Sequence, residues 1–355
     1  IIVARAVTGL RRMIFDAVPM PLKLAITAGI GLFILFIGLV DAGFVGSTGL
    51  PSPPLGLGAK GAGSITTIPT LIFVFTLLLT GILVARKVRG GILIGLIAGT
   101  LIAVAVEAIW HLGSAVDKPG GWSLSVPTLS GSPVAVPDLS LVGEFSLASF
   151  GRIGILAGIM LVFTLVFTNF FDAMGTFTGL SRQAGLTDAQ GNFPRLQSAL
   201  VVEGAGAVVG GAVSASSNTV FIESGTGIGE GARTGLASLV TGTLFLAAMF
   251  LTPLAAIVPS EVAAAALVVV GALMASVLRD IDFDDFSVTL PVVLTVAVMP
   301  LSYSIANGIG VGFIAWVVLR SASGRAREIS PLLWVVAVGF LLYFARGWID
   351  SLVGV

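Results

Sequence analysis

The polar stretch SASSNTVFIESGTGIGEGARTG, at residues 214–235, carries a carboxylate, Glu223, between two long apolar segments. A charge at the centre of a bilayer costs about 3 kcal/mol on insertion scales. Glycine-rich, non-helical backbone is tolerated at that depth only where it is buried in protein or lines a cavity. An acid beside such a break therefore indicates a site at which a solute is bound within the membrane.

A second carboxylate, Asp172, lies in the equally apolar stretch LVFTLVFTNFFDAMGTFTGL at residues 161–180. In a helix, Thr176 follows it by one turn on the same face. An acid and a hydroxyl with phenylalanines nearby suit a flat polar heterocycle, because the acid accepts N–H protons and an aromatic ring can stack on the heterocycle. The alternative is that Asp172 only pairs with a polar group of another helix.

The residues before Glu223, which include Phe221 and Ile222, are β-branched or aromatic and favour an extended stretch. Glu223 and Ser224 would then open a short helix, whose free N–H groups attract an anion or an acceptor atom of a ligand. We therefore expect residues 214–222 to be extended and to open onto a cavity that also holds Asp172. The alternative is that Glu223 caps its own helix.

A third acid, Glu203, lies inside the apolar segment ALVVEGAGAVVGGA, whose glycines predict tight helix packing. It is either a structural hydrogen-bond partner or a group that carries a coupling proton. Glu107 lies near the end of another apolar segment and is expected to reach the membrane interface. The acidic run at residues 280–285 is expected to be a solvated loop and not a metal site.

The composition is that of a protein that crosses a membrane several times. The 355 residues are 56% hydrophobic and 10% charged, with a mean hydropathy of +1.08, whereas soluble domains carry about 25% charged residues. The formal net charge is zero, so nothing indicates a nucleic-acid partner. The absence of cysteine excludes a thiolate metal site. No nucleophile–base pair appears in the sequence, so we expect neither an enzyme nor a cofactor.

Ten apolar segments approach the length of about 20 residues that is needed to cross a bilayer. They are residues 22–42, 65–85, 91–110, 153–178, 197–213, 234–258, 261–278, 286–300, 305–319 and 331–344. The connection at residues 111–152 is long, rich in Pro, Gly and Ser, and poor in Lys and Arg, while basic residues gather in other connections. By the positive-inside rule, the basic loops are cytoplasmic and this connector is extracytoplasmic.

At these residues the chain resembles the xanthine/uracil permease superfamily of nucleobase–cation symporters, and within it the azaguanine-type hypoxanthine/adenine/guanine permeases. The similarity is carried by FFDAMGTFTGLSRQAGL (170–186), SNTVFIESGTGIGEGARTGL (217–236) and MPLSYSIANGIGVGF (299–313). Residues 18–39 and 85–100 support it, so the similarity extends over essentially the whole chain.

The resemblance implies an all-α polytopic membrane protein with seven plus seven spans in two inverted repeats, divided into core and gate domains, with a short strand at mid-membrane. Residues 1–112 would hold the end of the fourth span and the fifth to seventh spans of the gate. Residues 113–152 would form the extracytoplasmic connector, and residues 153–258 the eighth to eleventh spans of the core. Residues 259–355 would supply the twelfth to fourteenth spans of the gate and a C-terminal helix. The first three spans and most of the fourth would be missing, as in an N-terminally truncated protein.

The resemblance further implies proton-coupled uptake of a purine nucleobase (hypoxanthine, guanine or adenine) by a multi-pass protein of the cell membrane. The implied substrate-binding residues are Asp172, Thr176, Phe221, Ile222, Glu223 and Ser224. A carboxyl group in an apolar site can exchange a proton near physiological pH, and the candidates for the coupling proton are Glu223, Asp172 and Glu203. The alternative function is an anion transporter or channel, of sulfate or bicarbonate type, on the same scaffold. The small residues of the gate spans are compatible with a homodimer.

Overall fold

The computed structural model describes residues 17–58, 61–118, 120–128, 132–144, 155–188, 193–221, 224–229 and 231–353. These residues are mostly helical. The α-helices are α3 (Met20–Asp41), α4 (Ile68–Ala85), α5 (Gly91–Trp110), α7 (Ile155–Gln183), α8 (Leu196–Ala212), α9 (Ser224–Gly229), α10 (Gly235–Ala248), α11 (Thr252–Ala256), α12 (Ser260–Ala275), α13 (Phe286–Leu301), α14 (Ile305–Ala322) and α15 (Pro331–Val353). Three 3₁₀ turns, η2 (Met249–Leu251), η3 (Ser276–Asp280) and η4 (Ala326–Glu328), and a small antiparallel pair of strands, β1 (Val45–Ser47) and β2 (Leu55–Leu57), complete the described elements.

Each of the ten apolar segments of the sequence coincides with one of these helices or with a run of them, so the prediction of a helical polytopic protein is confirmed. Among the described residues, six helical stretches are long and apolar enough to cross a membrane. They are Met20–Asp41, Ile68–Ala85, Gly91–Trp110, Gly235–Ala256, Ser260–Asp280 and Ile305–Ala322. Three shorter apolar helices are Leu196–Ala212, Phe286–Leu301 and Pro331–Ala345.

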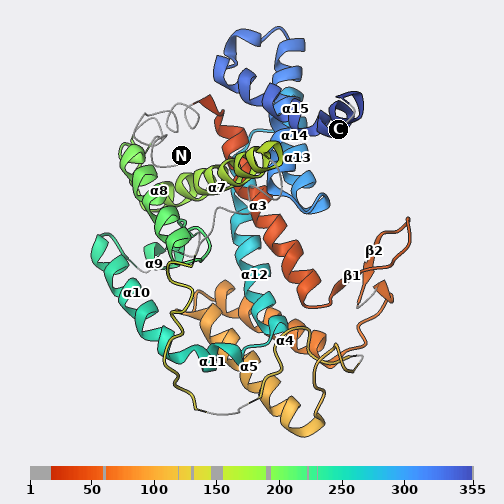
Figure 1. Cartoon of the computed structure of the whole chain (residues 1–355), viewed down its shortest axis with the longest axis vertical. Helices are drawn as coiled ribbons and strands as arrows, with labels where there is room; N and C mark the ends of the chain where they lie inside the picture. The colour runs from red at the N-terminus through yellow and green to blue at the C-terminus, as the bar shows by residue number, and fades with distance from the viewer. Residues whose placement is uncertain are drawn as a thin grey trace. The chain divides into compact units, whose positions relative to one another are not determined.

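The chain divides into two compact units, and each is described by itself. Unit 1 comprises Ile1–Phe33, Leu139–Gly229 and Met274–Val355, and unit 2 comprises Ile34–Asp138 and Glu230–Leu273. Unit 1 therefore holds α7, α8, α9, α13, α14 and α15, whereas unit 2 holds the strands, α4, α5, α10 and α11 (Figure 1).

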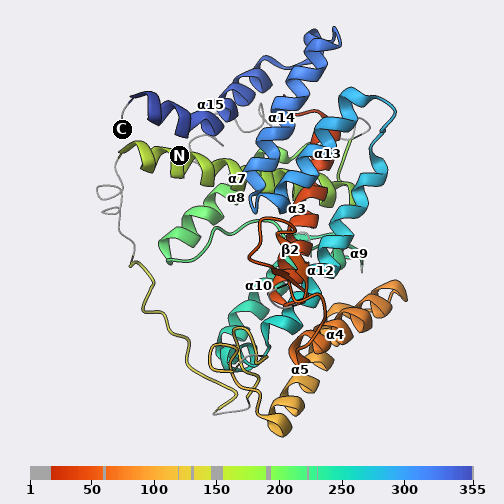
Figure 2. The same cartoon turned by 90° about the vertical axis from the view of Figure 1, so that its right-hand side faces the viewer.

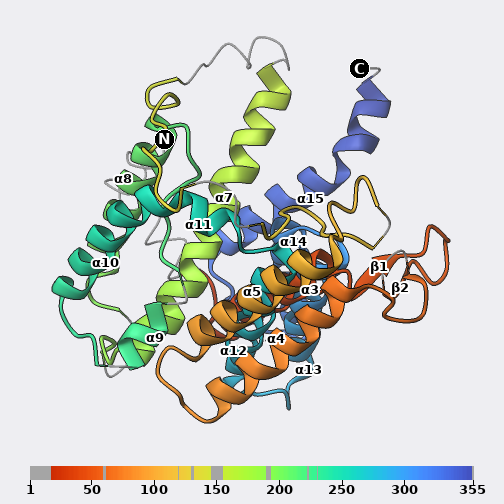
Figure 3. The same ribbon diagram turned by 90° about the horizontal axis from the view of Figure 1, so that it is seen from below.

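In unit 2, α4 and α5 form a hairpin and run side by side (Figure 3). The buried face of α5 repeats at every fourth residue and consists of Gly91, Gly95, Gly99, Ala103 and Glu107. A Cβ atom on Gly99 or on Gly95 would overlap the hydroxyl oxygen of Thr76 or of Thr80 on α4. These small residues thus permit the close approach of two helices, as is common in membrane proteins.

The hairpin of α13 and α14 in unit 1 repeats this packing (Figure 2). A Cβ atom on Gly312 would overlap the hydroxyl oxygen of Thr295, and one on Gly308 would overlap the side chain of Met299. Thr295 donates its hydroxyl hydrogen bond to the carbonyl of Pro291 at 2.7 Å, as Thr76 does to the carbonyl four residues before it at 2.8 Å. The sequence shows no convincing repeat, and the two hairpins are recognised as alike only through these contacts.

Replacing Gly99 by leucine is expected to lower the thermal denaturation temperature of the detergent-solubilised protein clearly. The added side chain has to displace the back-bonded Thr76, and overpacking of this kind costs about 1–3 kcal/mol. Gly81→Leu on α4 is the matched control, because no heavy atom lies within 4 Å of a Cβ built there. Equal denaturation temperatures for the two variants would show that the hairpin does not depend on this contact.

Asp285 connects the two ends of the α13–α14 hairpin and is not simply solvated, as the acidic run suggested. Its carboxylate caps α13 by accepting hydrogen bonds from the amide and hydroxyl of Ser287, at 2.9 and 2.7 Å. It also contacts Arg325 and lies 3.3 Å from Nη1 of Arg320 at the end of α14. The bonds from Ser287, followed by Arg325, lower the pKa of Asp285 to about 2. Aspartate is a favoured residue at such caps, but its presence in an acidic run does not show which aspartate caps a helix and which lies in a loop.

The stability that Asp285 contributes is expected to disappear at low pH. Since its pKa is lower in the folded protein than its ordinary value of 3.8, the contribution is complete above that value and is lost as the pH falls toward 2. Asp285→Asn should therefore denature at a lower temperature than the unchanged protein at pH 7, and the difference should shrink between pH 4 and pH 2. A difference that is the same at both ends of this range would contradict the assignment.

Glu107 lies in the last turn of α5, and the expectation that it reaches the membrane interface stays a prediction. Within the protein its side chain is buried, with 7% exposed. The reason is a partner that the sequence does not reveal: the indole N–H of Trp122 donates a hydrogen bond to its Oε2 at 2.9 Å. Trp122 belongs to the Pro- and Gly-rich connector and is itself completely buried.

Candidate functional site

The long helix α7 carries two of the predicted site residues, Asp172 and Thr176. The helix is continuous, so Thr176 follows Asp172 by one turn, as the sequence predicted. The side chain of Thr176 is buried, with 4% exposed, and its hydroxyl donates to the carbonyl of Ala173 at 3.0 Å. The side chain of Asp172 lies outside the described part of the structure.

The predicted break between two membrane segments is present. Helix α8 ends at Ala212, residues 215–221 contain no helix, and α9 begins at Ser224. The prediction that this stretch interrupts the helix is therefore confirmed for residues 215–221, which we call the broken segment. Ile222 and Glu223 lie outside the described residues. Of their neighbours, Phe221 is 61% exposed and Ser224 is also exposed.

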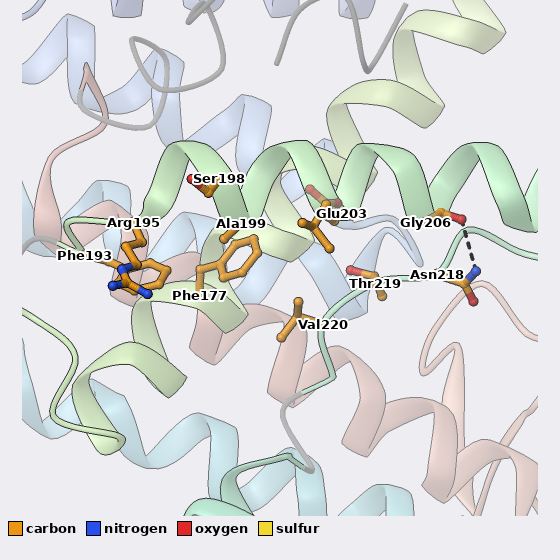
Figure 4. A pocket seen from close by; sticks show the side chains of 11 residues that line it. Phe177, Phe193, Arg195, Ser198, Ala199, Glu203, Gly206, Asn218, Thr219 and Val220 are labelled. Carbon is orange, nitrogen blue, oxygen red and sulfur yellow. Dashed lines mark hydrogen bonds between the residues drawn. The ribbon is translucent and has the colours of Figure 1, made fainter. Parts of the chain in front are cut away.

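The broken segment packs against the glycine-rich face of α8 (Figure 4). The side-chain amide of Asn218 donates to the carbonyl of Gly206 at 3.0 Å. A Cβ atom on Gly210 would overlap the carbonyl oxygen of Ser216. These two glycines were predicted to pack against another helix, and here they instead admit non-helical backbone. Within the described ranges, β1 and β2 are the only strands that pair, so the broken segment is held by α8 and not by a neighbouring strand.

Glu203 is buried in the same region, with 4% exposed. Its Oε1 accepts a hydrogen bond from the side-chain amide of Asn169 at 2.9 Å. This bond joins α8 to α7, because Asn169 precedes Asp172 by three residues on α7. A hydrogen-bonded carboxylate is the form in which a buried acid is tolerated. The bond supports the structural role that the sequence left open, and it leaves the proton-carrying role as a proposal.

A cavity of about 480 Å³ lies between α8 and the broken segment. Aromatic, polar and charged side chains contribute to its wall. The lining residues are Phe177, Phe193, Arg195, Ser198, Ala199, Val202, Glu203, Gly206, Asn218, Thr219 and Val220 (Figure 4). The prediction that the non-helical stretch opens onto a cavity is thus confirmed for residues 218–220, whereas the prediction that the same cavity holds Asp172 falls on a side chain outside the described part of the structure.

Two hydroxyl groups of the broken segment have no hydrogen-bond partner in the described part of the chain. They are Oγ of Ser217 and Oγ1 of Thr219, and both atoms are buried. A buried polar atom without a partner is costly, about 1–3 kcal/mol, and calls for an explanation. Thr219 also lines the cavity, so a polar ligand there is one candidate partner for its buried hydroxyl.

The start of α9 is fixed by α7. The side-chain amide of Gln183, at the end of α7, donates to the carbonyl of Gly225 at 2.8 Å. A Cβ atom on Gly225 would lie only 2.6 Å from Oε1 of Gln183, so glycine permits this contact. Gln183 thus connects the helix of Asp172 to the turn that follows Glu223.

Sequence reasoning missed four amide or hydroxyl side chains of this site. They are Asn169, Gln183, Asn218 and Thr219. Each lies within or directly beside the motif of Asp172 (170–186) or the motif of Glu223 (217–236). A neutral polar side chain in an apolar segment is common, however, and by itself is weak evidence for a binding site. A search for amides spaced around intramembrane acids would have found Asn169 and Gln183.

The profile of the group described as the Permease family, which contains the xanthine and uracil carriers, matches residues 1–311. The chain belongs to the xanthine/uracil permease family. The family consists of transporters, and together with the spanning helices this makes the permease a multi-pass membrane protein.

Characterised relatives agree with this assignment. The guanine/hypoxanthine permease PbuG of Bacillus subtilis (strain 168) is 37% identical over 344 residues, which cover 97% of this chain and 72% of PbuG. The adenine permease AdeP of Escherichia coli (strain K12) is 36% identical over 326 residues, covering 92% of this chain and 67% of AdeP. The guanine/hypoxanthine permease PbuO of Bacillus subtilis (strain 168) is 32% identical over 342 residues, covering 95% and 73%.

Proposed function

We propose that the permease takes up purine nucleobases together with protons. The observation that carries the proposal is the cavity beside the broken segment, whose wall includes Thr219 with a hydroxyl that has no partner among the described residues, the buried carboxylate of Glu203, and two phenylalanines, Phe177 and Phe193. Such a wall offers hydrogen bonds and an aromatic surface to a flat polar heterocycle. The names of the relatives, which are guanine, hypoxanthine and adenine permeases, favour a purine.

The acids of the two motifs have the central roles in this proposal. Asp172 and Glu223 accept N–H hydrogen bonds from the base, and one of them, or Glu203, carries the coupling proton. Thr176, Phe221, Ile222 and Ser224 stay in the proposal as further contacts of the base, although the cavity wall holds their neighbours Phe177 and Val220 and not Thr176, Phe221 or Ser224 themselves. Support comes from the continuity of α7 through Asp172 and Thr176, and from the helix break at residues 215–221, which precede Glu223 in the chain.

For the fold we propose the seven-plus-seven inverted-repeat arrangement, with the domain limits given above for core, gate and connector. The contacts of the α4–α5 and α13–α14 hairpins support it, because each hairpin has two glycines four residues apart, Gly95 and Gly99 or Gly308 and Gly312, and the second of each pair lies against a threonine of the other helix. Repeats of this kind are common in secondary transporters, with the substrate near the middle of the membrane. A homodimer through gate helices remains part of the proposal.

An anion carrier of sulfate or bicarbonate type is the second candidate, which the resemblance implies as the alternative on the same scaffold. The acids argue against it. A carboxylate at a short helix start repels an anion that the helix dipole alone would attract. Glu203 on the cavity wall adds a further acidic group to the same region.

Uptake of labelled hypoxanthine by cells that express the complete gene tests the proposal. We expect uptake that unlabelled guanine or adenine suppresses, that an uncoupler of the proton gradient abolishes, and that sulfate or bicarbonate does not affect. Suppression by sulfate, or uptake of labelled sulfate itself, would favour the anion carrier. Expression should be verified by immunoblot, so that a lack of uptake is meaningful.

Thr219→Val is expected to weaken purine binding about threefold to tenfold, the effect of one lost hydrogen bond. Valine keeps the shape of the side chain but removes the hydroxyl that has no partner in the described part of the chain. Thr219→Ser should restore the affinity. Thr241→Val is the matched control, because this exposed hydroxyl on α10 already donates to the carbonyl of Ala237 at 2.9 Å. Unchanged affinity in Thr219→Val would remove this hydroxyl from the site.

A further inference from the structure

The cavity beside the broken segment is elongated along α8, and all of its lining residues belong to unit 1. Its lining on this helix begins with Arg195 and ends with Gly206, which are separated by about 16 Å along the helix axis. Its volume of about 480 Å³ lies within the range of about 300–1,000 Å³ that is typical of sites for drug-sized ligands. A purine base is smaller than such ligands, so a base bound at one end leaves the other end open.

The broken segment and Glu203 share one end of the cavity. The segment runs along α8 toward the start of the helix, because it meets Gly210 first and Gly206 two residues later. Two residues of extended chain advance about 6.6 Å, and four helical residues advance about 6 Å. In this register the next residue, Thr219, comes to the level of Glu203, and both line the cavity. Arg195 lies about 12 Å from that level along the helix axis.

Arg195 forms the opposite end of the cavity together with Phe193 and Ser198, and we call these three residues the Arg195 end (Figure 4). Arg195 is the N-cap residue of α8, but its side chain makes no capping bond. Its guanidinium forms neither an ion pair nor a hydrogen bond with any residue that the structure describes. Figure 4 shows it well away from Glu203. Its N–H donors are therefore available to a ligand in the cavity.

The two ends of the cavity differ in the purine edges that they can recognise. A hydroxyl such as that of Thr219 both donates and accepts, so it can bond to a donor or to an acceptor of a base. A guanidinium only donates, through N–H groups in a fixed plane. It matches the adjacent O6 and N7 acceptors of guanine, whereas adenine presents an amino donor in the place of O6. Hypoxanthine carries the same O6 and N7 acceptors as guanine.

We propose that the Arg195 end is a second purine position, selective for the 6-oxopurines guanine and hypoxanthine against adenine. The inference rests on the proposed purine uptake and adds a position to it. Arg195 donates to O6 and N7 of the base, Phe193 offers an aromatic surface, and Ser198 adds a hydroxyl. The first position, beside Thr219, accepts all three purines, so the permease holds two 6-oxopurines but only one adenine.

The competing interpretation is that Arg195 is only one of the basic residues of a cytoplasmic loop. Arg182 provides the matched control for this interpretation. It lies in the last turn of α7, at the other end of the same loop, is exposed, and is not on the cavity wall. Arg182→Ala thus removes the same charge from the same loop without changing the cavity.

Equilibrium dialysis of the purified complete gene product against labelled hypoxanthine or labelled adenine tests the second position. We expect two molecules of hypoxanthine per permease at saturation, and one molecule of adenine over the same concentration range. A lost hydrogen bond to a charged group corresponds to about 10- to 100-fold in affinity, which keeps adenine from the Arg195 end in this range. Unlabelled guanine should displace both hypoxanthine molecules, and unlabelled adenine only one.

Arg195→Ala should bind one molecule of either base, and the molecule that remains shows that the variant is folded. Arg195→Lys should also bind only one, because an ammonium group lacks the planar fork that contacts both acceptors. Arg182→Ala should bind like the unchanged permease.

Several results would overturn the second position while leaving purine binding intact. They are one hypoxanthine molecule per unchanged permease, two adenine molecules at the same concentrations, two hypoxanthine molecules in Arg195→Ala or Arg195→Lys, and an equal loss in Arg182→Ala. A loss of both molecules in Arg195→Ala would also overturn it, because Arg195 would then support the whole cavity. If the unchanged protein binds no purine at all, the proposed function itself is contradicted.

Discussion

Replacing Glu223 by glutamine in the complete gene product is expected to abolish proton-driven purine uptake. Glutamine keeps the shape of the side chain but cannot exchange a proton, and it presents an N–H group where the base requires an acceptor. Both losses act on the same step, so the expected effect is larger than that of one hydrogen bond. Initial uptake rates of labelled hypoxanthine as a function of external pH provide the measurement.

Glu328→Gln is the control for this substitution, because Glu328 lies in η4 with 62% of its side chain exposed. It should transport like the unchanged permease. If Glu223→Gln takes up hypoxanthine at the original rate and with the original pH dependence, Glu223 is neither a substrate ligand nor a coupling group. The helix-capping role would then account for this residue.

Asp172→Asn is expected to weaken purine binding by about 10- to 100-fold, because a hydrogen bond to a charged group contributes about 1.5–3 kcal/mol. The amount of protein in the membrane should change much less than the affinity. The dissociation constant of the purified protein for hypoxanthine, measured by calorimetry beside a quantitative immunoblot, separates the two effects. Asp282→Asn, in the exposed loop before α13, is the matched control.

The opposite result for Asp172→Asn is equally informative. Normal affinity combined with poor abundance would show that Asp172 pairs with another helix and supports the fold alone. The neighbouring bond between Asn169 and Glu203 already joins α7 to α8, so a second structural bond at Asp172 is the competing explanation that this experiment decides.

The helices could be predicted because hydropathy reports directly on burial in lipid. Each apolar segment corresponds to one helix or to a run of helices, and most of their ends lie within a few residues of the expected limits. Two helices continue further into less apolar sequence: α7 ends at Gln183 and α15 at Val353. The break after α8 was also predictable, since Ser216, Ser217 and Asn218 compete with a helix through their side chains.

Partners distant in sequence could not be predicted. The burial of Glu107 was not predicted, because nothing near it in the chain marks Trp122, 15 residues away, as its donor. Gly206 and Gly210 led to the prediction of a neighbouring helix. Small residues at this spacing permit the close approach of any backbone, and in the structure the backbone that approaches them is the non-helical broken segment. Asp285 was predicted to lie in a solvated loop, because the sequence does not show that Ser287 and Arg325 interact with its carboxylate.

The site was predictable in its acids but not in its neutral groups. Intramembrane carboxylates stand out because their cost in lipid demands a reason. The hydroxyls of Ser217 and Thr219 carry no such signal, since either side chain can bond to its own backbone in a helix or turn. Only the structure shows that these two atoms are buried without a partner among the described residues.

The central claim, proton-coupled purine transport, is tested most directly in proteoliposomes that contain the purified complete gene product. Labelled hypoxanthine should accumulate inside above its external concentration when the interior is made alkaline, and it should leave again when the pH gradient is collapsed. Liposomes with Glu223→Gln should show no accumulation. Uptake that only reaches the external concentration, regardless of the gradient, would contradict proton coupling, and an absence of hypoxanthine uptake beside active sulfate uptake would contradict the purine assignment.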